Sequence, residues 1–578
     1  MTGSGLRKRT AVLAVLAALS LSACAGMGSG APAALPEAPI RNTVSGDYLN
    51  ALHAYRNSDL SAAAQNFAAV LDADPGNPGL MQQAFLAKVV DGRTGEALDL
   101  AEDLVKRQGG NAFGRLALAL TALKQNDYDD ARRHLDALEE SRLTQILRPL
   151  LLAWVEAGTG NWQAANAHLD KIRKQGGFGL LAELHAGYIA ALKGDFDALD
   201  AAFKTALKGI DRPPARLRIG AALHYAKLGR VDVAQEILAA GDLSDQNMTA
   251  LSAALFAAEA GQDAKGLVSN ASDGVAEALF DIASALQRDR GSEIALIYAR
   301  LALYMRPDFP LARLLVGEIL DDRGRHGDAL NIYAHIGQDS IYHMMARLRS
   351  ASAYDAEGDR DSALAVLQEL ARTYPDNGTV LVRLADTLRA GENWKAAISA
   401  YDKAFDKLEG AATQDWTLYY TRGIALERAK KWERAESDFL AALKLAPEQP
   451  YVMNYLGYSW VEQGLNLKEA QTLIERAVQQ RPDDGYIVDS LGWVLYRTGQ
   501  HNEAVPHLER AVQLRPGDAV INDHLGDAYW QAGRRREAAY QWRRSLEMDP
   551  DSELAAQLER KLRDGITSET GKHSADNG

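Results

Sequence analysis

The chain has 578 residues, with 64 basic side chains, 77 acidic side chains and a formal net charge of −13. This acidic balance excludes a general nucleic-acid binder, which needs a basic face to displace counterions from phosphates. Alanine and leucine dominate the composition, and no sustained alternation of β-branched residues occurs. We therefore expect an all-α protein with almost no sheet.

The N-terminus has the features of a bacterial secretory signal. Residues 7–9 are basic, and the apolar run over 11–21 is too short to remain as a transmembrane helix. The run closes with Leu-Ser-Ala-Cys, ending at Cys24, and this motif resembles the lipobox of bacterial lipoproteins. The resemblance implies that residues 1–23 are removed and that Cys24 carries the lipid, and Ala25 after it favours the outer membrane. The alternative is an ordinary signal peptide with a chance cysteine.

The segment after the signal changes from a linker to helical repeats. Residues 24–44 are rich in glycine, alanine and proline, which predicts a flexible tether. From residue 45 to 275 we predict degenerate helical repeats, because turn-plus-alanine signals such as those at 92–98 and 160–165 recur near a period of 34 residues. Residues 242–274 are the least regular and form a candidate joint between two halves. Cys24 is the only cysteine, so no intramolecular disulfide can form.

The array over residues 276–550 is more regular, and its last units are the clearest. Pro447, Pro482, Pro516 and Pro550 follow one another at intervals of 35, 34 and 34 residues. Within each interval the same residue types return: Leu-Gly at 456–457, 491–492 and 525–526, alanine at Ala470, Ala504 and Ala538, and a large apolar residue at Ile474, Leu508 and Trp542. This pattern predicts stacked pairs of amphipathic helices, in which the glycine allows the second helix to approach the first.

These residues closely resemble the tetratricopeptide repeat (TPR) family. The resemblance implies a superhelical solenoid of antiparallel helix pairs, and one pair cannot bury both of its faces alone. Gly499 and Gly533 are expected to end the first helices of their units. Arg422 stands where later units have leucine, so we expect looser packing or a changed angle over 405–425, and a solvated insert explains the departure equally well. We predict a capping helix over residues 551–564 and a disordered tail over residues 565–578.

No catalytic, cofactor or metal motif is present in the sequence. There is no His-Glu-x-x-His, no glycine-rich phosphate loop and no Gly-x-Ser-x-Gly elbow. His501 and His507 are six residues apart, which does not place both rings on one helical face, and we assign these and His524 to surface or packing roles. We therefore expect neither an enzyme nor a cofactor-binding protein.

A binding groove is the better supported prediction. The first helix of each unit should line the inner, concave surface, where residues three and four apart share a stripe. Aromatic rings and carboxylates in that stripe suit an extended, partly basic peptide, although Trp493 and Trp530 could equally fill space between helices. The predicted groove residues are Tyr451, Asn454, Tyr458, Tyr486, Asp489, Trp493, Tyr496, Asp523, Asp527 and Trp530.

The expected function is that of a lipid-anchored periplasmic scaffold that binds other envelope proteins or peptides. The alternative is a carbohydrate-binding or polysaccharide-export component whose aromatic stripe stacks on sugar rings. The carboxylate-clamp groove known in the TPR family is not matched, because Asp489, Asp523 and Asp527 have the opposite charge. The sequence leaves self-association and the identity of the partner open.

Overall fold

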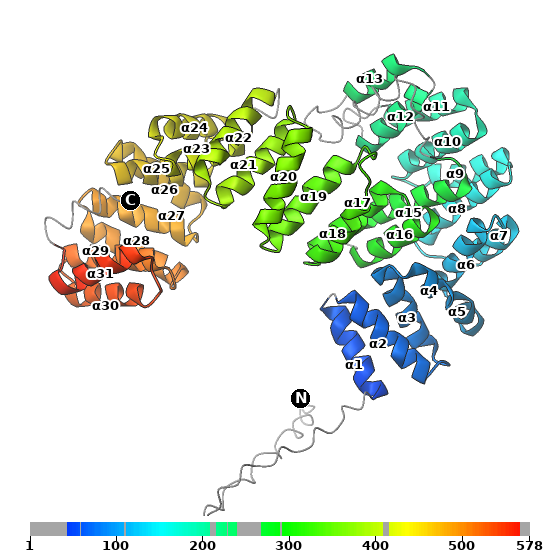
Figure 1. The fold of residues 1–578 in the computed structure, drawn as a ribbon, viewed down its shortest axis with the longest axis horizontal. Coiled ribbons are helices and arrows are strands. Elements are labelled where there is room, and N and C mark those ends of the chain that lie inside the picture. Colours follow the sequence, from blue (N-terminus) through cyan, green and yellow to red (C-terminus); the bar gives the residue numbers. More distant parts are fainter. Residues whose placement is uncertain are drawn as a thin grey trace, which may run out of the picture.

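The computed structural model describes residues 43–57, 59–108, 111–208, 215–227, 229–239, 268–288, 292–408 and 415–566. Within these ranges every regular element is an α-helix, which confirms the all-α prediction. Successive helices form antiparallel pairs, and the pairs stack into a long curved solenoid (Figure 1).

The first half of the solenoid begins at Val44. Its helices are α1 (Val44–Arg56), α2 (Leu60–Ala73), α3 (Pro78–Asp91), α4 (Thr94–Leu98), α5 (Ala101–Arg107), α6 (Ala112–Lys124), α7 (Tyr128–Asp136), α8 (Thr144–Gly158), α9 (Trp162–Arg173), α10 (Gly179–Lys193), α11 (Phe196–Leu207), α12 (Ala215–Lys227), α13 (Val231–Ala239), α15 (Ala271–Arg288) and α16 (Ser292–Met305).

The second half continues from Pro310 to Asp564. Its helices are α17 (Pro310–Asp322), α18 (His326–Ala334), α19 (His343–Ala356), α20 (Arg360–Thr373), α21 (Gly378–Ala390), α22 (Trp394–Lys407), α23 (Trp416–Arg428), α24 (Trp432–Leu445), α25 (Pro450–Gln463), α26 (Leu467–Gln480), α27 (Gly485–Arg497), α28 (His501–Leu514), α29 (Ala519–Gln531), α30 (Arg535–Leu546) and α31 (Ser552–Asp564).

The residues that recur in the last units lie at the contact between the two helices of each pair. A Cβ atom on Gly492 would lie 2.4 Å from Cγ of Leu508, and one on Gly526 would lie 2.4 Å from Cδ1 of Trp542. Because no side chain fits at that distance, only glycine lets the second helix pack this closely. Leu508 and Trp542 are fully buried by this approach, which is the role that the spacing predicts for them.

The predicted ends of the first helices also agree with the structure. Gly499 has φ of +83° and Gly533 has φ of +79°, and each lies two residues beyond the last residue of its helix. This left-handed conformation suits glycine, since it carries no Cβ atom. The chain can then reverse into the second helix of the pair.

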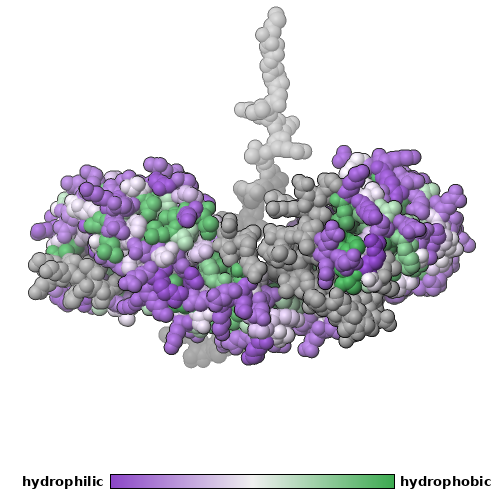
Figure 2. Space-filling view, turned by 90° about the horizontal axis from the view of Figure 1, so that it is seen from above, coloured by the Kyte–Doolittle hydropathy of each residue, from purple (hydrophilic) through white to green (hydrophobic). Residues whose placement is uncertain are grey.

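The first helices of the C-terminal units lie next to one another along the solenoid. α25 contacts α27, and α27 contacts α29, in addition to the contact of each helix with its own partner. The first helices therefore form a continuous inner layer, as the repeat pattern predicts. Seen from above, polar and charged side chains cover most of both halves of the molecule, with smaller apolar areas between them (Figure 2).

The first half of the solenoid folds over its own inner layer. The pair α15–α16 packs on α8 and α10 at one end and on α3 and α4 at the other, so it lies inside the curve made by the preceding units (Figure 1). One continuous buried cluster consequently runs from Ala51 to Ala346. The hydrophobic core therefore continues across residue 275, where we predict the boundary between degenerate and regular repeats.

Trp154 is the centre of this internal contact. Its ring is fully buried, and a Cβ atom on Gly274 of α15 would lie 2.2 Å from Cε3 of the indole. The indole N–H donates to Nδ1 of His185 at 3.0 Å, and Nε2 of His185 lies 3.2 Å from Oδ2 of Asp281. Since an indole can only donate, Nδ1 of the imidazole accepts and the ring proton sits on Nε2, facing the carboxylate.

Polar contacts hold both ends of α16. Tyr55 of α1 donates a hydrogen bond to Glu293 of α16. Lys124 of α6 donates to the backbone carbonyl of Tyr304 at 2.9 Å and lies 4.0 Å above the centre of that ring. This helix is thus held by residues from helices that precede it by more than a hundred positions.

Arg422, which stands where later units have leucine, forms a set of ion pairs. Its guanidinium donates to both oxygens of Asp438 at 2.7 and 2.8 Å and to Asp402 at 3.1 Å. It also lies 3.7 Å above the ring of Phe405. Against the expectation of looser packing, the described residues around Arg422 are therefore closely connected, while residues 409–414 lie outside the described ranges.

Several predicted segments fall outside the described residues. These are the signal peptide, all but the last two residues of the tether, most of the candidate joint over 242–274 and nearly all of the C-terminal tail. The capping helix is present as α31. Among the helices that the structure describes, none has the length and apolar character needed to cross a bilayer.

Candidate functional site

The ten predicted groove residues all lie on first helices, but they differ widely in exposure. Tyr451 is 41% exposed and Tyr486 is 52% exposed. The others are partly or fully covered by neighbouring helices: Asn454, Tyr458, Tyr496 and Trp530 are half-buried, and Asp489, Trp493, Asp523 and Asp527 are buried. The expectation of one exposed stripe is therefore wrong, because adjacent first helices contact each other and cover the side chains between them.

Trp493 is packed between neighbouring rings. Its indole stacks on His524 with ring centres 3.9 Å apart and on Tyr496 with centres 4.9 Å apart. The indole N–H donates to Glu462 on the preceding first helix. Both faces and the polar edge of Trp493 are thus engaged within the chain, which answers the open choice between groove and packing in favour of packing.

Asp489 is paired with His524 in the same buried layer. Nδ1 of His524 lies 2.9 Å from Oδ2 and 3.1 Å from Oδ1 of Asp489. Burial opposes the charge on His524, but the attraction and hydrogen bond of Asp489 outweigh it and raise the pKa of the imidazole. This carboxylate is therefore paired with a residue of the next unit.

Asp523 and Asp527 both pair with one lysine of the capping helix. Nζ of Lys561 on α31 lies 2.8 Å from both oxygens of Asp523 and 2.8 Å from Oδ2 of Asp527. Asp527 also accepts from the indole N–H of Trp542 at 2.9 Å. Burial and the charge of Asp523 raise the pKa of Asp527 to about 6. Both carboxylates therefore have hydrogen-bond partners inside the protein.

Trp530 is covered by the chain that follows the capping helix. A Cβ atom on Gly565 would lie 2.2 Å from Cζ2 of the indole, so only glycine fits over the ring there. Trp542 packs on Trp530 with ring centres 5.4 Å apart, and the guanidinium of Arg535 lies 5.1 Å from the ring centre. Trp530 of α29 therefore packs between α30 and the residues that follow α31.

Tyr458 and Asn454, two further predicted groove residues, are half-buried in the inner layer. Burial raises the pKa of Tyr458 well above its ordinary value, with the carboxylates of Glu462 and Asp489 adding to the effect. The side-chain oxygen of Asn454 is buried and finds no hydrogen-bond partner among the described residues. An acceptor without a partner at this depth marks a position where an additional donor would be stabilising.

Two arginines that the repeat pattern did not single out flank the exposed tyrosines. The guanidinium of Arg481 lies 5.6 Å from the ring centre of Tyr451, and that of Arg515 lies 4.9 Å from the ring centre of Tyr486. Each arginine directly precedes a closing proline, at 481–482 and 515–516. The repeated Arg-Pro pair was the signal in the sequence that could have identified them.

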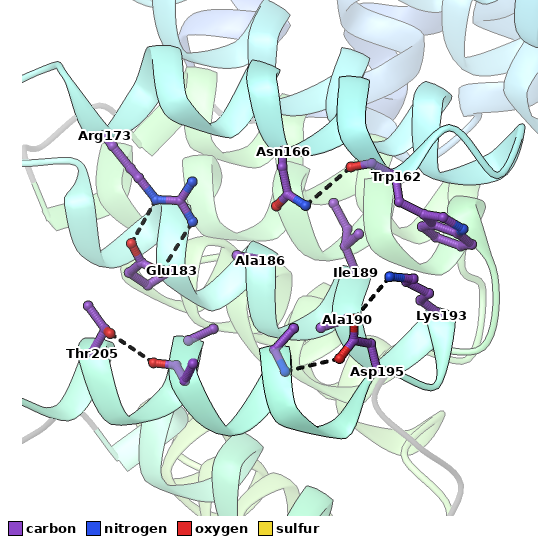
Figure 3. Close-up of a pocket in the computed structure, with 13 residues that line it drawn as sticks. Trp162, Asn166, Arg173, Glu183, Ala186, Ile189, Ala190, Lys193, Asp195 and Thr205 are labelled. Atoms are coloured by element: carbon purple, nitrogen blue, oxygen red, sulfur yellow. Dashed lines mark hydrogen bonds and ion pairs between the residues drawn. The ribbon is translucent and has the colours of Figure 1, made fainter.

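A cavity of about 300 Å³ lies between α9, α10 and α11 (Figure 3). The polar groups around it bond to each other or to the backbone: Arg173 donates to Glu183 at 2.7 Å, Lys193 donates to Asp195 at 2.9 Å, and Asn166 donates to the carbonyl of Trp162 at 3.2 Å. Since these donors and acceptors are already satisfied, the cavity presents no convergent set of polar groups to a ligand.

The described residues offer no group of three His, Cys, Asp or Glu side chains arranged to hold a metal ion. His501 and His507 lie apart on α28, and burial lowers the pKa of each. His501 packs against Tyr496 with ring centres 5.2 Å apart. These histidines serve packing in the structure, as the sequence spacing indicates.

Comparison with known proteins identifies the repeats in the second half. Two sequence models, both described as tetratricopeptide repeat, match residues 348–412, 420–485 and 463–519, and residues 495–562. A TPR repeat-containing protein of Pseudomonas aeruginosa, PA4667, is 26% identical over 194 residues, which make up 33% of this chain and 32% of that protein. The match thus spans about a third of the relative's length.

Three solved structures with similar folds cover different shares of this chain. The APC/C hetero-tetramer Cut9–Hcn1 contains a chain that is 16% identical, with 91% of this chain and 97% of that chain covered and a TM-score of 0.37. Yeast Tom70 is 14% identical, with 90% and 95% covered and a TM-score of 0.31. YrrB, a TPR protein with an unusual peptide-binding site, is 21% identical, with 34% and 97% covered and a TM-score of 0.27. The chain is thus an all-α solenoid that carries tetratricopeptide repeats in its second half.

Proposed function

We propose that this protein is a lipid-anchored scaffold of the bacterial envelope, which binds other envelope proteins through the inner face of its second half. The observation that carries the proposal is the difference between the two halves. The inner layer of the first half is filled by α15–α16, whereas the inner layer from α17 to α29 keeps exposed aromatic side chains at Tyr451 and Tyr486.

The shape of the second half supports binding of polypeptide. Adjacent first helices present a preformed, repeated surface, so the scaffold loses little conformational entropy when a partner binds. Exposed tyrosines are rigid and amphipathic, and such residues are enriched where proteins bind one another. The Leu-Ser-Ala-Cys motif at 21–24 supports the lipid anchor at Cys24, which would raise the effective concentration of the scaffold near membrane partners.

The alternative of a carbohydrate-binding groove has less support. It depends on exposed faces along the aromatic stripe, but Trp493 and Trp530 are enclosed by His524, Tyr496, Trp542 and the chain at Gly565, which leaves only Tyr451 and Tyr486 of the predicted residues well exposed. Sugar rings stack on exposed aromatic faces. The observations therefore favour a protein partner.

A crosslinking pull-down from intact cells tests the proposal. It compares the native chain with a Cys24→Ala variant that carries a cleavable signal peptide. A defined envelope protein recovered with both forms, in larger amount with the native chain, supports a tethered scaffold. Equal recovery of the partner with both forms removes the role of the anchor, and recovery of glycan or lipid without protein contradicts the scaffold itself.

A further inference from the structure

We infer that the inner edge of the last units binds an acidic, extended segment of the partner protein, through two arginines that lie against exposed tyrosines. The two pairs are Arg481 with Tyr451 and Arg515 with Tyr486. This inference rests on the proposed function and specifies the chemistry of its partner. It replaces the expected partly basic peptide, because the carboxylates that suggested such a peptide are buried and paired within the chain.

The two arginine–tyrosine pairs occupy equivalent positions of successive units. Tyr451 lies in the first turn of α25 and Tyr486 in the first turn of α27. Arg481 and Arg515 follow directly after α26 and α28. Each pair therefore joins the start of a first helix to the end of the second helix of the same unit, and the arrangement repeats along the solenoid.

The carboxylates near these arginines are already engaged elsewhere. Glu448 accepts hydrogen bonds from Arg476 and Gln480, and Asp483 accepts one from Arg510 at 2.8 Å. Asp484 and Asp518 accept backbone N–H groups at the starts of α27 and α29. Within the described part of the chain, neither Arg481 nor Arg515 forms an ion pair. The edge therefore carries two arginines that are not committed to a carboxylate of the described chain, and an added anionic group would compete there with the charges that Asp483, Asp484 and Asp518 retain.

Stacking on tyrosine prepares each arginine for an anionic group. A guanidinium that lies along an aromatic face keeps its planar fork of N–H donors free, and this fork matches the two oxygens of a carboxylate. The rings of Tyr451 and Tyr486 are about half exposed, so they also offer apolar contact beside each charge. The site thus combines a bidentate cation with an aromatic surface.

The spacing selects the form of the partner. α25 and α27 are in contact, and the two arginines lie against tyrosines at equivalent positions of these helices, so we expect the two guanidinium groups to be separated by the spacing of the helices, about 8–10 Å. An extended polypeptide advances about 3.3 Å per residue, so carboxylates three residues apart are separated by about the same distance. We therefore expect an extended segment of the form Glu-x-x-Glu, with one carboxylate on each arginine.

The test is a titration of the purified full chain with fluorescent ten-residue peptides in a glycine-serine background. One peptide has two glutamates three residues apart, a second has them adjacent, and a third has lysines in their place. We expect the first peptide to bind several-fold more tightly than the second, and the lysine peptide not to bind. Arg481→Gln and Arg515→Gln should each weaken binding of the first peptide about tenfold, as expected for loss of a charge-assisted hydrogen bond.

Matched controls exist about one turn earlier in the same second helices. Arg476 and Arg510 are exposed arginines that already pair with Glu448 and Asp483, so Arg476→Gln and Arg510→Gln should leave peptide binding unchanged. Absence of binding by the di-glutamate peptide, equal binding of the lysine peptide, or equal effects of the control variants would overturn the inference. Competition by a single-stranded oligonucleotide with the same arginine dependence would also overturn it.

The inference and the proposed function can fail separately. If the doubly substituted Arg481→Gln, Arg515→Gln chain still recovers its envelope partner in the crosslinking pull-down, the scaffold function stands and the acidic-segment site is wrong. If neither chain recovers a protein partner although the peptide binds through the arginines, the site stands and the scaffold function is wrong.

Discussion

Lys561 of the capping helix donates hydrogen bonds to both Asp523 and Asp527 of α29, each at 2.8 Å. The ammonium group and the two carboxylates are all buried. The sequence predicts that a basic group of a partner binds these carboxylates. In the structure, Lys561 of the same chain binds them instead. The capping helix α31 therefore covers the C-terminal end of the inner face.

Replacing Lys561 should leave the buried carboxylates uncompensated. Lys561→Met leaves Asp523 and Asp527 close together without a cation, and we expect the free energy of unfolding to fall by about 3–5 kcal/mol. Urea unfolding followed by tryptophan fluorescence measures the change. Lys106, a largely exposed lysine paired on the surface of α5, provides the control, and Lys106→Met should leave the urea midpoint nearly unchanged. Similar losses for both variants would show that the buried network is not stabilising.

Protonation of His524 should make the last units more stable in mild acid. Asp489 raises the pKa of the folded imidazole above its ordinary value, so the protonated form contributes stability fully below about pH 6.5 and loses it as pH rises through the folded pKa. Besides Asp489, the carboxylates of Asp523 and Glu462 face this group. Urea unfolding between about pH 5.5 and 9 should show stability falling with pH in the native chain. The slope should be smaller in His524→Gln, and an unchanged slope would contradict the role of this pair.

Gly274 should be required for the filled inner face of the first half. Gly274→Ala places a methyl group against the buried ring of Trp154, and we expect a loss of about 1–3 kcal/mol from overpacking. Hydrogen exchange should show faster exchange in α8 and α15. A methyl group added at Gly95 in α4 would have no heavy atom within 4 Å, so Gly95→Ala should not increase exchange in those helices. Unchanged exchange in Gly274→Ala would contradict the close packing of α15 on α8.

Arg422 and Asp438 should behave as a coupled pair. Arg422→Leu restores the residue type found in later units but leaves the buried Asp438 without its cation, so we expect a loss of about 3–5 kcal/mol. Asp438→Leu in the same chain should recover most of that loss, because both charges are then absent. Additive effects of the two substitutions in urea unfolding would show that the ion pair contributes little.

The sequence predicts those parts of the fold that depend on local spacing. The Leu-Gly pairs, the alanines and the residues Ile474, Leu508 and Trp542 define each unit within 34 positions, and the structure packs them as expected. Gly499 and Gly533 end their helices for an equally local reason, the left-handed turn. Such features are readable because every partner lies within one repeat.

Features that depend on distant partners could not be predicted. Trp154 meets Gly274 across 120 positions, and neither residue belongs to a motif that links the two. The positions of Asp489, Asp523 and Asp527 on first helices are evident from the repeat, but their pairing with His524 and Lys561 requires the packing between units. The repeat pattern therefore locates the inner layer without deciding which of its side chains remain exposed.

Site-specific photocrosslinking in intact cells tests whether partners bind the inner face of the second half. A photoreactive amino acid is placed at Tyr486, on a first helix, or at Tyr540, a similarly exposed tyrosine on the second helix α30. We predict a crosslink to a defined envelope protein from position 486 and none from position 540. A crosslinked protein from position 540, with none from position 486, would contradict binding at the inner face.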